Sequence, residues 1–194
     1  MPKDALQRLL EGNRRYVENK STLDESASRR IEVAQHQTPF ATILSCVDSR
    51  VPPELIFDQG LGDLFVIRTA GQVLDQAVLG SLEFGVAKLG IPLLVIMGHE
   101  RCGAVKAAIE VLEKHTVAEA DIDYLVDALA PAVEIGVKGG GDIWDGAVRA
   151  QIALLVEKLK SSPILVTAVE EGKLKIVGAW YNLETGVVEI TVDQ

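Results

Sequence analysis

The chain contains little cysteine, no excess of basic residues and no long apolar run. Two cysteines among 194 residues are too few for the disulfide framework that staples small secreted domains. A chain of this length, with 48% apolar residues, builds its own core as one domain and needs no staple. We therefore expect a reducing compartment, where the cysteines bind a metal or take part in catalysis.

The charge balance and the short apolar runs exclude two classes of partner. The net charge of −9 disfavours binding to nucleic acid or to an anionic membrane surface. No apolar run approaches the roughly 20 residues of a membrane-spanning helix. The first residues, Met1–Leu6, lack the basic start and apolar middle of a signal peptide. We expect a cytoplasmic protein that binds neither nucleic acid nor membrane.

Signatures of other function classes are also missing. The chain has no internal repeat, no low-complexity tract and no dinucleotide-binding fingerprint. Gly98 and Gly103 flank a turn from strand to helix, as in a nucleotide site. However, Ala104 and Val105 stand where a phosphate-binding loop has Lys and Ser or Thr. The span Cys46–Arg50 is also too short for a phosphatase-type loop.

Short apolar runs alternate with helical patterns along most of the chain. The sequence predicts strands at 40–45, 64–68, 92–97, 174–180 and 186–192, the last one antiparallel through a turn at 182–186. It predicts helices at 53–59, 75–89, 103–115, 121–135 and 143–160. We therefore expect an α/β fold with a mostly parallel central sheet of about four strands, a C-terminal antiparallel strand and flanking helices.

The N-terminal segment has no strand partner. Helical spacing of leucines predicts a helix at 4–18, and a second helix is expected at about 24–36 with Asp24 as its cap. We expect a single domain over 1–194, in which 1–36 form a helical arm and 37–194 form the α/β core. The arm is expected to lie over the domain or over a second subunit.

Both cysteines lie where an apolar strand ends. Cys46 ends the first strand, while His99 and Cys102 follow the third. Ligands of open parallel sheets bind outside the carboxyl ends of the strands, so the three side chains meet if these strands are neighbours. Two thiolates and one imidazole suit a zinc ion with an open fourth position, which is typical of catalytic sites. Cys102 also opens a helix, whose N-terminus favours the thiolate.

An acidic and a basic residue follow the first cysteine. Asp48 shares a face with Cys46 if the chain is still extended there, and Arg50 can hold the Asp48 carboxylate by two hydrogen bonds. Zinc lowers the pKa of a bound water to about 7, and an adjacent carboxylate orients the resulting hydroxide. Arg50 would keep Asp48 from taking the fourth zinc position itself.

Three other interpretations of these residues stay open at this point. His99 and Cys102 form the base and nucleophile of a cysteine hydrolase in one of them. In another, Asp48 completes a closed structural zinc site. In the third, the two cysteines fill core space, since cysteine is among the most buried residue types.

The two segments Cys46–Arg50 and His99–Gly103 resemble the Cys-x-Asp-Ser-Arg and His-x-x-Cys-Gly motifs of the β-class carbonic anhydrases. The resemblance implies one zinc per chain, bound by Cys46, His99 and Cys102, with Asp48 and Arg50 as a catalytic dyad. It also implies reversible hydration of carbon dioxide to bicarbonate and a proton. The expected assembly is a homodimer, or a homotetramer of two dimers, with its sites at the subunit interface.

The resemblance extends to the plant-like branch of that family. Gln37 stands nine residues before the first cysteine, where this branch binds substrate. Phe65 and the backbone N–H of Gly103 are expected to line the same pocket. Phe84 departs from the branch, which often carries Tyr at this position. The same scaffold supports hydrolases of carbon disulfide and carbonyl sulfide, so these remain alternative substrates.

Overall fold

A five-stranded sheet forms the centre of the molecule, and its strand order is β2-β1-β3-β4-β5. The computed structural model describes residues 1–193. The strands are β1 (Ala41–Cys46), β2 (Leu64–Thr69), β3 (Leu93–His99), β4 (Lys175–Tyr181) and β5 (Val188–Asp193). The first four are parallel and β5 is antiparallel to β4. The predicted mostly parallel sheet with an antiparallel C-terminal strand is confirmed.

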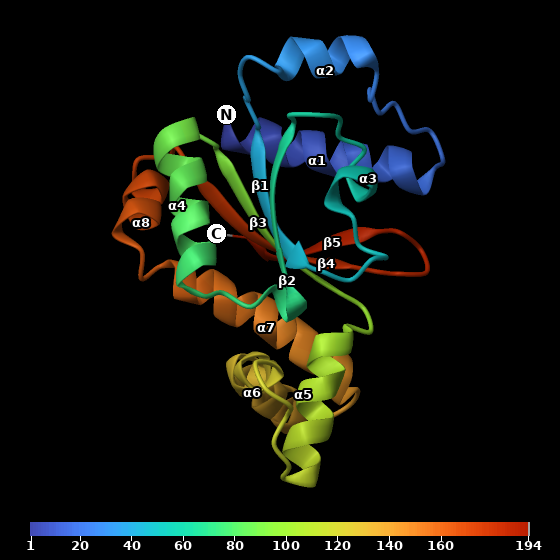
Figure 1. Ribbon diagram of the computed structural model, residues 1–194, viewed down its shortest axis with the longest axis vertical. Coiled ribbons are helices and arrows are strands. Elements are labelled where there is room, and N and C mark those ends of the chain that lie inside the picture. The colour runs from blue at the N-terminus through green and yellow to red at the C-terminus, as the bar shows by residue number, and fades with distance from the viewer. Residues whose placement is uncertain (194) are drawn as a thin grey trace.

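Helices cover both faces of the sheet (Figure 1). One face packs against α4 (Gln76–Leu89), α7 (Ile143–Leu159) and α8 (Pro163–Glu170). The other packs against α1 (Pro2–Val17) and α3 (Pro53–Ile56). All residues of β1 and β3 are buried, as expected for apolar strands in a covered parallel sheet.

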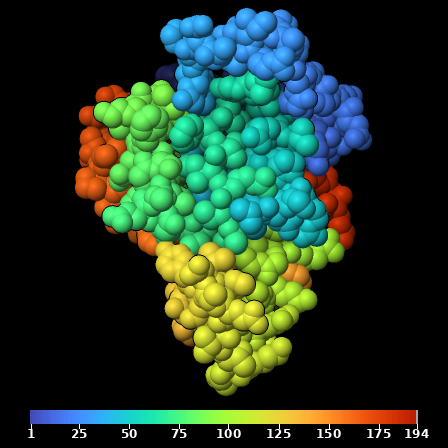
Figure 2. Space-filling model, in the orientation of Figure 1, coloured from blue at the N-terminus to red at the C-terminus, as the bar shows by residue number. Residues whose placement is uncertain are grey.

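Two further helices, α5 (Gly103–Lys114) and α6 (Ile122–Gly139), form a lobe beyond the carboxyl ends of the strands (Figure 1). In the space-filling view this lobe narrows away from the body of the molecule (Figure 2). Helix α7 joins the two parts, since it packs on the sheet and also on α6. Gly136 permits the close approach of α6 to α7, because a Cβ there would lie 2.8 Å from the Ala147 nitrogen.

The N-terminal arm consists of α1 and α2 (Ala27–Val33). Helix α1 lies close against α3, so that a Cβ at Gly12 would fall 1.8 Å from the Phe57 carbonyl oxygen. Helix α2 has no buried residue and sits at the top of the molecule in Figures 1 and 2. No helix among residues 1–193 is long and apolar enough to cross a membrane.

Some element boundaries differ from those predicted. Ser26, not Asp24, caps α2, because its side chain accepts a hydrogen bond from Arg29 N while Asp24 accepts from Ser26 N in the preceding turn. Helix α6 continues to Gly139, with Pro131 inside it. Helix α8 was not predicted, although Ser162 caps it.

Candidate metal centre

Cys46, His99 and Cys102 meet at the carboxyl end of the sheet. Their ligand atoms lie within 4.8 Å of one another, and all three residues are buried. The two sulfur atoms are 3.9 Å apart. The side chains converge because β1 and β3 are neighbours in the sheet. The predicted convergence is therefore confirmed.

A tight turn brings the last two of these residues to one point. His99 ends β3, and Cys102 is the N-cap residue of α5. Between them, Arg101 adopts a left-handed backbone conformation with φ of 53°. This conformation is uncommon for a residue with a side chain and costs on the order of 1 kcal/mol. The turn folds the chain back, so that Cys102 faces the strand ends.

One nitrogen of the His99 ring is buried without a partner. His99 Nδ1 lies 2.9 Å from the Glu100 carbonyl oxygen. Since a carbonyl only accepts, Nδ1 carries the proton and Nε2 presents its lone pair. Nε2 has no hydrogen-bond partner among residues 1–193. A buried lone pair beside two thiols fits a zinc ion, which prefers sulfur and nitrogen ligands.

The pKa values of the two thiols are shifted in opposite directions. The hydrogen bond between the two sulfur atoms lowers the pKa of Cys46, although burial opposes this shift. The Gly71 N–H, in the short helix η1 (Ala70–Gln72), lies 3.4 Å from the Cys46 sulfur. The same contact between the two sulfur atoms, together with burial, raises the pKa of Cys102. A divalent cation between the two sulfurs would allow both to ionise, so the pair fits a metal.

Asp48 and Arg50 form a closed pair beside the cluster. Arg50 donates from Nε and from Nη2 to the Asp48 carboxylate, at 3.0 and 2.7 Å, and its backbone N–H donates at 2.9 Å. These contacts lower the pKa of Asp48 to about 2, so the group is ionised at neutral pH. One Asp48 oxygen lies 3.9 Å from His99 Nε2. The carboxylate therefore lies beside the position that a metal would take.

Comparison with known proteins identifies the family. The family model of carbonic anhydrases matches residues 41–188. "Carbonic anhydrase 2" of Mycobacterium tuberculosis is 40% identical over 190 residues, which cover 95% of this chain and 90% of that protein. The chain belongs to the carbonic anhydrase family. The carbonic anhydrase of Mycolicibacterium smegmatis is 38% identical, over 97% of this chain and 93% of its own.

Solved structures of the β-class share the fold of this carbonic anhydrase. The β-carbonic anhydrase CcaA superposes with a TM-score of 0.76 at 25% identity, covering 95% of this chain and 94% of its own. The Coccomyxa β-carbonic anhydrase, solved with acetazolamide, gives 0.76 at 28% identity, covering 96% and 86%. The chain is therefore a β-class enzyme.

The expected substrate residues of this carbonic anhydrase lie in two places. Gly103 is the first residue of α5, next to Cys102, and a Cβ added there would meet no atom of another part of residues 1–193 within 4 Å. Gln37 is exposed in the loop before β1, at the opposite end of that strand from Cys46. Phe65 pairs with Thr42, four residues and roughly 13 Å along the strand from the level of Cys46. The fold of one subunit thus keeps Gln37 and Phe65 away from the cluster.

The geometry also bears on the alternatives left open by the sequence. A closed structural site would need Asp48 as a fourth ligand, but Arg50 holds both of its carboxylate oxygens. A cysteine hydrolase would need an accessible thiol, but Cys46 is 3% and Cys102 1% exposed. Both observations favour a metal site with an open position in this enzyme.

Two residues near the cluster were missed by sequence reasoning. Arg68 on β2 donates to the carbonyl oxygens of Cys46 and Asp48, at 2.9 and 2.6 Å. Trp144 at the start of α7 donates from its indole nitrogen to the Cys102 carbonyl oxygen at 2.8 Å. Arg68 is a charged residue within an apolar strand, which indicates a polar partner but does not identify Cys46 as that partner. No signal in the sequence indicated Trp144, because α7 is far from Cys102 along the chain.

Proposed function

We propose that this enzyme hydrates carbon dioxide reversibly to bicarbonate and a proton, with one zinc ion per chain. Cys46 Sγ, His99 Nε2 and Cys102 Sγ would hold the metal. The observation that carries the proposal is the unpartnered, buried His99 Nε2 between two thiols, beside an arginine-held carboxylate. Zinc, when bound, acts as a Lewis acid and lowers the pKa of a coordinated water to about 7.

The Asp48 carboxylate orients the nucleophile in this proposal. It is ionised, lies 3.9 Å from His99 Nε2 and, among residues 1–193, accepts hydrogen bonds only from Arg50. A carboxylate placed there accepts a hydrogen bond from the attacking water and directs an oxygen lone pair toward carbon dioxide. Arg50 donates to both carboxylate oxygens, which would keep Asp48 from serving as a ligand of the metal. Asp48 and Arg50 thus act together as the catalytic dyad.

The N-terminus of α5 is suited to the anionic product. Gly103 is the first helical residue, and the N–H groups of a first turn have no partner within the helix. The helix dipole favours negative charge at this end, so the Gly103 N–H would stabilise bicarbonate as it forms. A side chain at position 103 would enter the open space that the substrate needs.

We propose that a second subunit completes the pocket, in a cytoplasmic homodimer or dimer of dimers. Phe65 lies on the edge strand β2 and Gln37 in the loop before β1, both away from the cluster of their own chain. An edge strand has unpaired N–H and C=O groups that favour pairing with another chain. A tetrameric β-carbonic anhydrase of Sordaria macrospora shares the fold, with a TM-score of 0.72 at 21% identity.

Stopped-flow assays test the proposed reaction. We expect carbon dioxide hydration by a zinc-loaded sample, with a rate that rises as pH climbs through about 7. Carbonyl sulfide and carbon disulfide should be assayed with the same sample. Rapid hydrolysis of either, with no hydration of carbon dioxide from about pH 6.5 to about 9, would assign the scaffold to a sulfur substrate instead.

A further inference from the structure

The three proposed zinc ligands belong to two different parts of the molecule. Cys46 and His99 end strands of the sheet, whereas Cys102 is the N-cap residue of α5, a helix of the lobe (Figure 1). Helix α5 packs mainly on α6, and neither helix lies on a face of the sheet. The distance between Cys102 and the other two ligands therefore depends on what fixes the start of α5 to the body of the protein.

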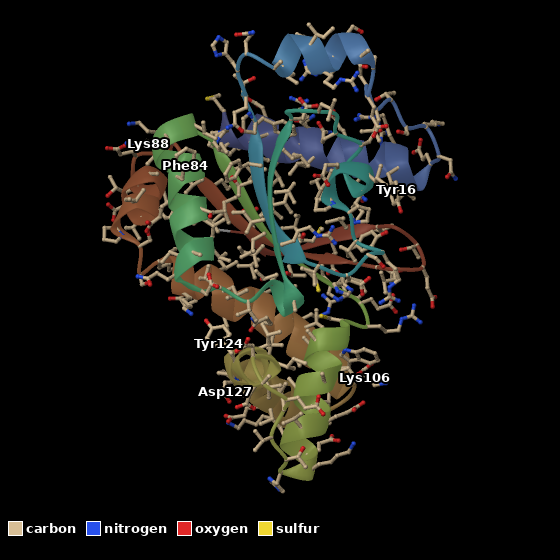
Figure 3. The ribbon with its side chains drawn as sticks, in the orientation of Figure 1. Tyr16, Phe84, Lys88, Lys106, Tyr124 and Asp127 are labelled. Atoms are coloured by element: carbon tan, nitrogen blue, oxygen red, sulfur yellow. The ribbon has the colours of Figure 1, made fainter. Side chains whose placement is uncertain are left out.

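Trp144 provides a direct link at this point. Its indole N–H donates to the Cys102 carbonyl oxygen at 2.8 Å. That oxygen also accepts the first hydrogen bond of α5, from Lys106 N at 3.0 Å. The Lys106 ammonium, whose residue is labelled on α5 in Figure 3, lies 5.5 Å from the centre of the Trp144 ring. Two contacts thus join the first turn of α5 to one side chain of α7.

Trp144 is itself held firmly. Asp142 caps α7 and accepts the Trp144 backbone N–H at 2.9 Å. The helix continues into the core, where Ile152 packs closely over Gly98 of β3 and Gly178 of β4. Helix α7 therefore packs on the sheet through Ile152 and contacts the carbonyl group of Cys102 through Trp144.

The chain's other tryptophan, Trp180, makes no such contact. Both rings line one cavity of about 440 Å³ behind the ligand turn, together with Glu100, Arg101, Asp142 and Asp145. The Trp180 indole nitrogen is buried and has no hydrogen-bond partner among residues 1–193. Arg149 stacks on the Trp180 ring instead, 4.4 Å from its centre. The two tryptophans thus line the same cavity, but only Trp144 contacts Cys102, one of the three proposed zinc ligands.

We propose that Trp144 is a positioning residue for zinc, which fixes the peptide of Cys102 so that its thiolate stays in register with Cys46 and His99. The inference rests on the metal site of the proposed function. Partners outside the ligand set typically change metal affinity by about 10-fold to 100-fold when they are removed. Trp144→Phe keeps an aromatic side chain but removes the N–H donor together with part of the ring volume, and Cys102 O retains its bond from Lys106 N. Trp180→Phe makes the same change of volume without removing a contact to Cys102.

The test measures zinc release to a chromogenic chelator from the zinc-loaded wild type and two variants. We expect Trp144→Phe to release zinc about tenfold faster and Trp180→Phe to behave as wild type. Cobalt-substituted samples should show altered thiolate-to-metal absorption only for Trp144→Phe. Equal release from wild type and Trp144→Phe, or equal acceleration in both variants, would overturn the inference. A wild type that binds no zinc would instead overturn the proposed metal site.

A second measurement does not depend on the folding of Trp144→Phe. In Trp180→Phe, Trp144 is the only tryptophan left, since the chain has two. We expect its fluorescence to change when the chelator removes zinc and to recover when zinc is restored. A contact that strengthens zinc binding is itself strengthened by bound zinc, so removal of the metal weakens the hydrogen bond between the Trp144 indole and the Cys102 carbonyl. An emission spectrum that stays unchanged through full removal of zinc would contradict the link.

Discussion

At the scale of single residues, two polar groups of the site differ in their hydrogen bonds. His99 Nε2 is left free by the bond from Nδ1 to Glu100 O, so the ring is already in the tautomer that a metal needs. Asp48 is in the opposite situation, because Arg50 occupies both of its oxygens. In the proposed site, His99 and the two thiols therefore bind the metal, while Asp48 stays free to take part in the reaction.

Replacing Arg50 with alanine tests this division of roles. We expect Arg50→Ala to keep its zinc but to lose hydration activity about 100-fold or more, since Asp48 is released toward the metal and its orienting role is lost. Metal analysis and stopped-flow assays on the same samples check this result. Arg30→Ala, on the exposed surface of α2, is the matched control and should behave as wild type. Near-normal turnover of Arg50→Ala would show that the dyad is wrongly assigned.

At the scale of elements, the arm is fixed by one buried carboxylate. Burial raises the pKa of Asp58, but hydrogen bonds from Ser21, Arg15 and Thr22 outweigh this and lower the pKa to about 2. These partners come from α1 and the segment that follows it, so Asp58 ties the arm to the loop after α3. Because the pKa in the unfolded chain is about 3.9, the ionised form stabilises the fold above about pH 4.

Asp58→Asn should therefore change how stability depends on pH. In the wild type, the contribution of Asp58 is lost as pH falls through about 4 toward about 2. We expect the variant to be about 2 kcal/mol less stable at neutral pH, and its stability to fall less steeply in that acid range. Urea unfolding at several pH values measures both effects. Asp127→Asn, exposed on α6 (Figure 3), is the control; an equal pH slope in wild type and Asp58→Asn would refute the assignment.

The contact between α1 and α3 makes a separate prediction. A Cβ at Gly12 would overlap the Phe57 carbonyl oxygen, at 1.8 Å, so Gly12→Ala must push α1 off α3. We expect a loss of about 2–3 kcal/mol in the free energy of unfolding. In Gly80→Ala on α4, nothing lies within 4 Å of the new Cβ, so this variant should be unchanged or up to about 1 kcal/mol more stable. Thermal unfolding compares the two, and equal stability would contradict the described packing.

At the scale of the whole molecule, the edge of the sheet is the surface that the proposed dimer would use. All six residues of β2 are only partly buried, while all of β1 is buried. We expect Phe65→Arg to shift a dimer toward monomer in analytical ultracentrifugation and to lower hydration activity. Val117→Arg, on a side chain that is 78% exposed near the tip of the lobe, should leave both unchanged. A Phe65→Arg protein with wild-type assembly and activity would remove β2 from the interface.

Much of the fold and the core of the site could be predicted, since both depend on strands. Apolar runs ending at Cys46 and His99 locate the carboxyl edge of a parallel sheet, where their side chains must meet. The N-cap of α2 and the helix α8 were less predictable. Asp24 and Ser26 are both good caps, and only the local turn selects one of them. The residues of α8 form a short apolar run without clear helical spacing.

The supporting contacts of the site could not be predicted for a different reason. Trp144 reaches Cys102 only because α7 packs against both the sheet and the lobe, and Arg68 reaches Cys46 only in the observed strand register. Both contacts depend on the packing of elements that are far apart in sequence. Helix and strand patterns carry no information about such distances.

The central claim is that a zinc ion held by Cys46, His99 and Cys102 is needed for hydration of carbon dioxide. The most direct test strips the metal with a chelator, restores zinc in measured steps and follows hydration in a stopped-flow instrument. The account predicts no activity without metal and a rate that rises in proportion to bound zinc until one ion per chain is reached. Hydration that survives removal of the metal, or that is absent at full zinc occupancy, would contradict it.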